Sequence, residues 1–180
     1  MNNKSELRII AKSIRKNLPL DIISKKAVEQ IRKCDLYKKA QNVMLYYPTK
    51  YEINLLELFN DNKNFYLPRV NGEHLDICPY KNGDKLKKSD FKILEPINNS
   101  VKCEILDLVI VPALMADSQG YRLGYGGGYY DRFLSAYPDI YSVGLAYECQ
   151  VVNEVRADTW DRRLDMVITQ ESMYVTGTGR

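Results

Sequence analysis

The chain has 180 residues, of which 45% are hydrophobic and 27% charged, and its formal net charge is +3. These values fit one compact globular domain and argue against a disordered chain. Residues 1–40 hold eleven Lys or Arg against four Asp or Glu, a local +7, so the rest of the chain carries −4. This basic N-terminal segment is either a solvated helix face or a surface for an anion.

The N-terminal sequence predicts two helices. In the first, from Lys4 to Asn17, apolar residues recur every three or four positions: Leu7, Ile10, Ala11, Ile14 and Leu18. Four cations follow the same spacing beside this apolar stripe: Lys4, Arg8, Lys12 and Arg15. Pro19 ends the first helix, and a second is expected over Asp21–Lys33.

The remaining elements alternate in type. Val43–Tyr47 predicts a buried strand, followed by a helix from about Ile53 to Asn60. Further strands are expected at residues 65–67, 75–78, 108–111, 141–145 and 166–168, with a helix at 129–137. The continuous apolar runs suit a largely parallel sheet covered on both faces, so we predict a layered α/β fold.

Domain limits follow from the same pattern. Lys81–Glu104 is rich in Lys, Asp and Asn and predicts a long, partly irregular surface segment. No repeat or linker divides the chain, so we expect one domain over residues 1–175 and a flexible tail over 176–180.

Cysteine and histidine usage narrows the chemistry. The four cysteines are scattered without a C-x-x-C pair, and the one histidine, His74, excludes a multi-histidine metal site. No segment resembles a signal peptide or reaches the roughly 18 apolar residues of a membrane span. We therefore expect a cytoplasmic protein with reduced thiols that has no membrane partner.

The most informative segment is Asp117–Leu134, which holds five of the ten glycines and four of the fourteen tyrosines. Glycines at 124, 126, 127 and 128 allow a backbone that brings several N–H groups to one anion. Tyr129 stands where a dinucleotide fingerprint needs its third glycine, and the P-loop pattern is absent. On the glycines alone, a phosphate-binding loop and a tight structural turn are equally favoured.

The neighbours of these glycines favour a nucleotide triphosphate. Arg122 is suited to phosphate oxygens, and Asp131, on the first turn of the expected helix, is suited to Mg²⁺. The alternative for Asp131 is an acidic residue that only stabilises a helix N-terminus.

The run LDLVIVPALMADSQGYRLGYGGGYYDRFL resembles the defining segment of the 5-formyltetrahydrofolate cyclo-ligase family. Further resemblances follow in order along nearly the whole chain: Lys4-Ser-Glu-Leu-Arg8, Tyr46–Asn54, Leu67–Val70, Trp160-Asp161 and Leu164–Thr169. The resemblance implies a fold like that of sugar-phosphate isomerases and CoA-transferases.

The resemblance also implies roles for individual residues. Those implied to bind ATP are Lys4, Arg8, Arg122, Leu123, Gly124, Tyr125, Gly126, Gly127, Gly128, Tyr129 and Tyr130. Tyr47 and Glu52 are implied to contact the folate, Arg122 and Asp131 to be catalytic, and Asp131 and Asp161 to hold Mg²⁺. The chain departs from the family pattern at Leu75, Trp160 and Gln170.

The activity implied by the resemblance is the MgATP-dependent conversion of 5-formyltetrahydrofolate to 5,10-methenyltetrahydrofolate. ADP and phosphate are released, and the reaction passes through a phosphorylated formyl group, an imidate phosphate. The enzyme is expected to act as a monomer in one-carbon metabolism, without a nucleic-acid partner.

Two alternatives remain open on the residues alone. A sugar-phosphate isomerase or CoA-transferase-like enzyme would share the fold and the use of glycine loops for anions. An RNA-binding module would use the basic N-terminus, although no RRM or KH pattern is present and the remaining chain is acidic.

Overall fold

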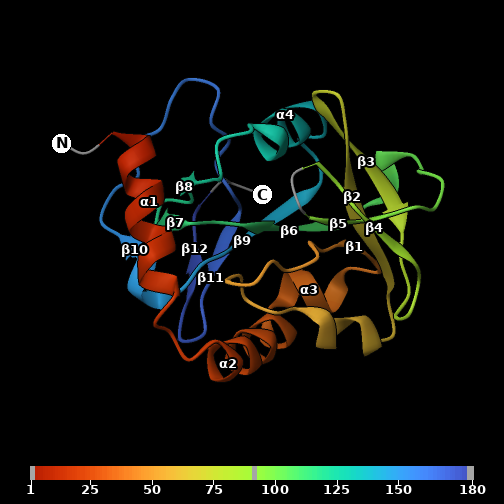
Figure 1. Ribbon diagram of the computed structural model, residues 1–180, viewed down its shortest axis with the longest axis horizontal. Coiled ribbons are helices and arrows are strands. Elements are labelled where there is room, and N and C mark those ends of the chain that lie inside the picture. Colours follow the sequence, from red (N-terminus) through yellow and green to blue (C-terminus); the bar gives the residue numbers. More distant parts are fainter. Residues whose placement is uncertain (1–2, 91–92, 178–180) are drawn as a thin grey trace.

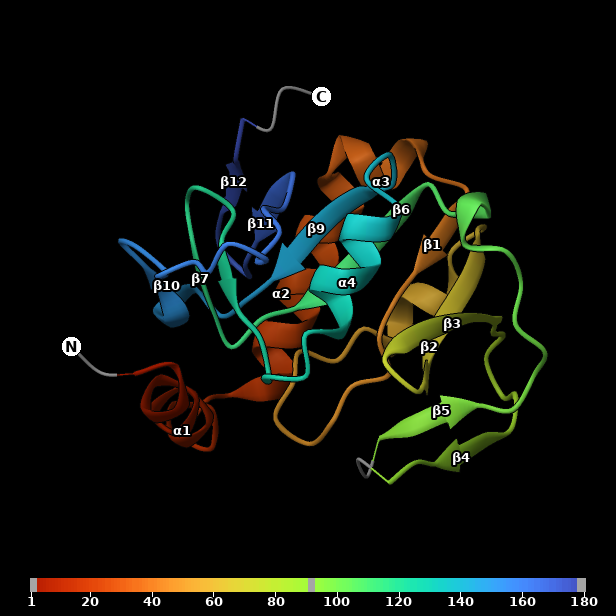
Figure 2. The same ribbon diagram turned by 90° about the horizontal axis from the view of Figure 1, so that it is seen from above.

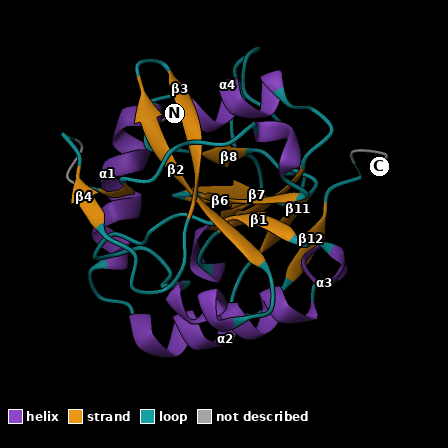
Figure 3. Ribbon diagram, turned by 90° about the vertical axis from the view of Figure 1, so that its right-hand side faces the viewer, coloured by secondary structure: helices purple, strands orange, loops and turns teal. Residues whose placement is uncertain are grey.

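A computed structural model describes residues 3–90 and 93–177 as three layers, with a central sheet between helices. The helices α2 (Leu20–Lys33) and α3 (Asp35–Lys39) cover one face, and α4 (Tyr129–Ala136) covers the other (Figures 1 and 3). This confirms the α/β architecture predicted from the alternating elements.

The central sheet has seven strands in the order β12-β11-β9-β6-β1-β2-β3. Five neighbouring strands are parallel: β1 (Asn42–Met44), β2 (Asn64–Asn71), β6 (Leu108–Pro112), β9 (Tyr141–Leu145) and β11 (Met166–Ile168). The edge strands β3 (His74–Pro79) and β12 (Met173–Val175) pair antiparallel. Parallel strands covered by helices are buried on both faces, which explains why the sequence of these strands contains continuous apolar runs.

Side chains alternate between two cores along each strand. Leu108 and Ile110 of β6 pack in the cluster beneath α2. Val109 and Val111 of the same strand pack in the cluster beneath α4, against Phe133. The sheet thus joins the two helical layers and fixes the chain segments that leave its ends.

Two smaller sheets stand outside this sandwich. The strands β10 (Val151–Val152), β7 (Met115–Asp117) and β8 (Arg122–Leu123) form one, and α1 (Lys4–Arg15) lies beside it in Figure 1. A hairpin of β4 (Leu86–Lys88) and β5 (Leu94–Pro96) forms the other. In Figure 2, α1 and this hairpin lie at the two ends of one side of the molecule.

Four segments differ from the sequence prediction. The helix expected over 53–60 is a 3₁₀ helix at Leu56–Asn60, because Asn54 Oδ1 accepts from Leu56 N and holds the preceding residues in a turn. Two further 3₁₀ helices, Cys103–Ile105 and Glu148–Gln150, were not predicted. Lys81–Glu104, expected to be a long and partly irregular surface segment, contains the β4–β5 hairpin.

Helix α1 begins with a capping box between Asn3 and Glu6, and it buries only part of the predicted apolar stripe: Leu7, Ala11 and Leu18 pack against the cores. Ile10 and Ile14 are 41% and 36% exposed, whereas Ala11 and Arg15 are buried. Lys4, Arg8 and Arg15 bond the rest of the protein, whereas the two isoleucines are exposed. The buried face of the helix is therefore turned toward the cations relative to the expected stripe.

At the C-terminal end, Thr176 is buried and its hydroxyl bonds the Leu164 carbonyl, although it was expected to begin the flexible tail. Residues 178–180 of that tail lie outside the described residues. Within residues 3–90 and 93–177, no helix is long and apolar enough to cross a membrane.

Candidate active site

The strand order places a crevice at one edge of the sheet. From β1 the chain proceeds to β2 on one side, whereas β6, β9 and β11 follow on the other side. In open α/β sheets, ligands bind at the carboxyl ends of the strands where the order reverses in this way. The segments that follow β1 and β6 contain Glu52 and the glycine loop, respectively.

A cavity of about 380 Å³ lies between these segments. Its lining includes every residue that the sequence assigned to a ligand: Lys4, Arg8, Tyr47, Glu52, Arg122, Leu123, Gly124, Tyr125, Gly126, Gly127, Gly128, Tyr129, Tyr130, Asp131 and Asp161. The structure thus brings both ends of the chain and its middle to one site. Their individual roles stay predictions.

The glycine loop ends at the N-terminus of α4. Gly126 and Gly128 have φ angles of 107° and 69°, which favour glycine, and Gly128 is the N-cap of the helix. Gly128 has no side chain that could cap the first turn of α4, and the N-terminus of a helix favours an anion. The loop therefore has the geometry of an anion site.

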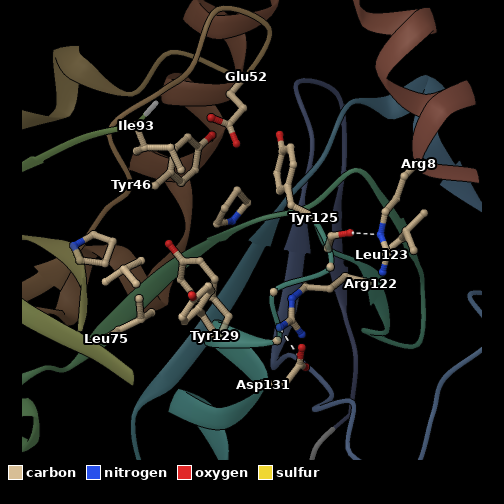
Figure 4. A pocket seen from close by; sticks show the side chains of 18 of the residues that line it. Arg8, Tyr46, Glu52, Leu75, Ile93, Arg122, Leu123, Tyr125, Tyr129 and Asp131 are labelled. Carbon is tan, nitrogen blue, oxygen red and sulfur yellow. Dashed lines mark hydrogen bonds and ion pairs between the residues drawn. The ribbon is translucent and has the colours of Figure 1, made fainter. Parts of the chain in front are cut away.

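Cations surround this loop, and two of them are paired with carboxylates. Arg122, 7% exposed, lies with Nη2 3.0 Å from Asp131 Oδ1. Lys4 Nζ lies 2.6 Å from an oxygen of both Asp158 and Asp161. Arg8 Nε donates to the Gly124 carbonyl at 2.9 Å, as Figure 4 shows.

The contacts of Lys4 shift the pKa values of Lys4 and Asp161. Burial alone would lower the pKa of Lys4 and raise the pKa of Asp161. The hydrogen bonds from Lys4 to Asp158 and Asp161, and their opposite charges, outweigh burial, so the pKa of Lys4 is raised and that of Asp161 is lowered. Both groups are therefore charged at neutral pH.

Asp131 and Asp161 are linked through the residue that follows Asp161. Arg162 N donates to Asp131 Oδ1 at 3.0 Å, and Arg122 Nη1 donates to the Arg162 carbonyl at 3.0 Å. Among the described residues, no three or more His, Cys, Asp or Glu side chains are grouped to hold a metal by themselves. Two carboxylates beside a loop with the geometry of an anion site fit Mg²⁺, which takes one or two carboxylates together with substrate phosphates.

The opposite half of the cavity holds Glu52, which is 8% exposed. Its Oε2 accepts from Thr49 N at 2.8 Å. Burial and the Glu52 charge raise the pKa of Tyr125 and Tyr130. Figure 4 shows Tyr125 between Glu52 and Arg8.

Apolar side chains complete this half of the cavity. Leu75 of β3, Val70 of β2 and Ile93, beside the β4–β5 hairpin, line it. Tyr47, predicted to contact folate, packs edge-on against Tyr80 with ring centroids 6.3 Å apart. An apolar lining beside the buried Glu52 carboxylate suits a flat, partly apolar ligand that offers N–H donors.

Sequence reasoning missed two parts of the site. The first is Asp158, which pairs with Lys4 as Asp161 does. Its position three residues before Asp161, in Asp158-Thr-Trp-Asp161, is the sequence feature that could have identified it. The hairpin residues Ile93, Leu94 and Glu95 also line the cavity, but nothing in that polar segment indicated a ligand.

The profile of the 5-formyltetrahydrofolate cyclo-ligase family matches residues 1–170. The chain belongs to this family. A 5-formyltetrahydrofolate cyclo-ligase of Haemophilus influenzae is 34% identical over 136 residues, which cover 69% of this chain and 73% of the relative. A probable cyclo-ligase of Schizosaccharomyces pombe is 29% identical and covers 94% of this chain and 96% of its own.

Solved structures agree with this cyclo-ligase assignment. The 5,10-methenyltetrahydrofolate synthetase of Aquifex aeolicus superposes with a TM-score of 0.83 at 32% identity, covering 98% of this chain and 94% of that one. A synthetase of the same name from Mycoplasma pneumoniae has a TM-score of 0.75 at 22% identity, covering 94% and 99%, and supports the fold.

The three departures from the cyclo-ligase pattern lie in different places. Leu75 and Trp160 both line the cavity, Trp160 with 68% of its surface exposed. Gln170 is outside the lining and accepts from Glu148 N at 3.0 Å. Only the first two departures are placed to contact a ligand.

Proposed function

We propose that this enzyme uses ATP to close 5-formyltetrahydrofolate to 5,10-methenyltetrahydrofolate, with release of ADP and phosphate. One observation carries the proposal: a single cavity joins a cation-rich glycine loop to a carboxylate and aromatic half. Two different ligands, one polyanionic and one aromatic with N–H donors, fit such a cavity side by side. Family membership favours this reaction over the isomerase and RNA-binding alternatives.

The chemistry explains the need for ATP. A formamide oxygen is a poor leaving group, so the γ-phosphoryl group is first transferred to it, which breaks the bond to ADP and forms an imidate phosphate. N10 of the folate then attacks the formyl carbon, and the C–O bond breaks as phosphate leaves. Phosphoryl transfer depends on positioning and charge neutralisation, not on a protein nucleophile.

In this proposal the glycine-loop half binds the triphosphate. Lys4, Arg8 and Arg122 neutralise phosphate charge, and the N–H groups of Gly124–Gly128 and of the α4 N-terminus orient the oxygens. Asp131 and Asp161 would hold Mg²⁺. When bound, the ion neutralises charge that develops on the transferred phosphoryl group.

The opposite half binds the folate. Glu52 is fixed by the Thr49 N–H and accepts hydrogen bonds from the reduced pterin, while Tyr47 packs nearby. Leu75 and Ile93 offer apolar contact to the ring system. The formyl group then lies between Glu52 and the glycine loop, where the γ-phosphate can reach it.

The test is an assay of the purified protein with 5-formyltetrahydrofolate and MgATP. We expect a rise in methenyl absorbance that requires both ATP and Mg²⁺, together with stoichiometric release of phosphate. A non-hydrolysable ATP analogue is the control and should give no product. Absence of ATP-dependent product from the folded protein would refute the reaction.

A further inference from the structure

Arg15, in the last turn of α1, is a buried cation that the proposed chemistry does not use. It is 3% exposed, and the ion pairs found among residues 3–90 and 93–177 do not include it. A buried guanidinium is costly unless its N–H groups are bonded. Its bonding partners should therefore reveal why the charge is placed there.

All three nitrogens of Arg15 donate hydrogen bonds. Nε donates to Gln150 Oε1 at 2.8 Å, Nη2 to the Ala113 carbonyl, and Nη1 to Tyr125 Oη at 3.0 Å. The guanidinium also lies over the Tyr147 ring, 4.7 Å from its centroid. The side chain is thus fixed from four sides.

The bond to Tyr125 fixes the direction of the tyrosine's proton. A guanidinium has donors and no acceptor, so Tyr125 Oη must accept from Arg15 and direct its own hydrogen elsewhere. The Glu52 carboxylate lies in that direction: Figure 4 shows it facing the Tyr125 hydroxyl, and burial together with the Glu52 charge raises the pKa of Tyr125. Although 42% of Tyr125 is exposed, its hydroxyl lies inside, between Arg15 and Glu52.

The same residue is held by the rest of the basic row of α1. Arg8 bonds the Gly124 carbonyl at 2.9 Å, and Lys12 Nζ lies 5.5 Å from the centroid of the Tyr125 ring. Three cations, spaced four and three residues apart, therefore contact two consecutive residues of the glycine loop. A helix that binds phosphate through Lys4 and Arg8 is in this way connected to Glu52.

We propose that Arg15 is a positioning residue for the folate-binding carboxylate. By donating to Tyr125 it turns the tyrosine hydroxyl toward Glu52 and holds that carboxylate in the orientation that the folate meets. The inference rests on the proposed function, because it takes Glu52 as the folate ligand. It adds a residue that lies outside the lining of the cavity and acts through Tyr125.

The test is a double-mutant cycle with Arg15→Lys, Tyr125→Phe and the double variant. Lysine keeps the charge but cannot bond Gln150, Ala113 and Tyr125 together, and phenylalanine keeps the ring but removes the hydroxyl. We expect each single variant to raise the KM for 5-formyltetrahydrofolate about fivefold, the effect of one lost hydrogen bond. The KM for ATP should change less than about twofold, because Tyr125→Phe keeps the backbone N–H through which the loop would bind phosphate. The folate KM of the double variant should equal that of the more affected single variant.

Arg32→Lys is the matched control. Arg32 bonds Asp61 and Glu57 beside α2, outside the cavity, so its loss should lower the melting temperature without changing either KM. If Arg15→Lys behaves in the same way, Arg15 only anchors α1 and the proposal is wrong. Additive effects in the double variant would also overturn it.

The experiment also gives an answer if Arg15→Lys does not fold or if the wild type is inactive. If Arg15→Lys does not fold, Tyr125→Phe alone decides, and an unchanged folate KM overturns the proposal. If the wild type has no activity, the proposed reaction fails. In that case the Kd for 5-formyltetrahydrofolate, measured by calorimetry, gives the same comparison among the variants.

Discussion

At the scale of single residues, the glycine-loop half of the cavity is a set of charges that neutralise one another. Asp131 is paired with Arg122, and Asp161 with Lys4. In the proposed reaction, a triphosphate would compete with the carboxylates for these cations and would leave the carboxylate oxygens free for Mg²⁺. Without a ligand, the ion pairs thus keep each of these four side chains ionised while giving each one a partner of opposite charge.

Asp131→Asn tests the metal role. Asparagine keeps the size of the side chain and an oxygen for the Arg162 N–H, but it loses the negative charge. We expect kcat to fall at least about 100-fold, as when a group that stabilises transition-state charge is removed. Steady-state kinetics and thermal unfolding measure the change and the integrity of the fold. The control is Asp139→Asn, an exposed position after α4, which should keep full activity; full activity of Asp131→Asn would remove this residue from the metal site.

Glu52→Gln tests the folate half. Glutamine keeps an acceptor for the Thr49 N–H, but its neutral amide accepts more weakly from the pterin. We expect the folate KM to rise about tenfold, because hydrogen bonds to a charged group are the stronger ones. The ATP KM should stay within about twofold of the wild-type value. Glu57→Gln, five residues later and outside the cavity, is the control; a larger effect on ATP than on folate would show that Glu52 is misassigned.

At the scale of elements, the sequence predicted those with strong local patterns. The strands at 108–112 and 141–145 have apolar runs, and α4 follows a glycine cluster at the position expected. Strands of two or three residues, such as β8 and β10, are too short to show a period, so the second sheet was not predicted. The hairpin at 86–96 has the polar composition of a loop.

The orientation of α1 shows a second limit of prediction from the sequence. Its isoleucines and its cations recur at the same helical spacing, so the pattern predicted a helix but not the face that is buried. The contacts of Arg15 with Gln150 and Ala113, more than 90 residues away in the chain, decide the orientation. Such contacts have no signal in the local sequence.

This orientation predicts an unusual pair of mutational effects. Ala11→Leu should lower the free energy of unfolding by about 1–3 kcal/mol, because Ala11 is fully buried and its carbonyl accepts from Gln150. Ile9→Ser, at a position 70% exposed, should change it by less than about 0.5 kcal/mol. Urea unfolding of both variants measures these values. A larger loss from Ile9→Ser would mean that the isoleucine face of α1 is covered in solution.

At the scale of the whole molecule, the active site depends on distant parts of one chain. Lys4, Glu52, the glycine loop and Asp161 come from four separate segments, and the sheet order brings them together. From the residues alone, only the glycine loop with Arg122 and Asp131 could be identified, because these lie within ten positions of one another. The resemblance to a family supplied the other members, and the fold explains why they meet.

The contact of Lys4 with Asp158 and Asp161 joins the first helix to the C-terminal part of the chain, and it predicts how stability depends on pH. The pKa of Asp161 is lower in the folded protein than its ordinary value near 4. A carboxyl of this kind stabilises the fold above its unfolded pKa, and that contribution is lost as the pH falls through the lower, folded pKa. Lys4→Met removes the partner, so the variant should be less stable than the wild type near pH 7.

Lowering the pH should reduce the stability of the wild type and of Lys4→Met by different amounts. Between about pH 5 and pH 2, urea unfolding should show the wild type losing more stability than Lys4→Met, so the difference between them narrows. Lys16→Met, at an exposed lysine that follows the same helix, is the control and should keep the wild-type pH dependence. If the difference between wild type and Lys4→Met stays constant over this range, the lost stability comes from packing of the lysine stem. The ion pair between the two ends of the chain would then add nothing to the fold, and the binding of phosphate would be the remaining physical reason for a cation at this position.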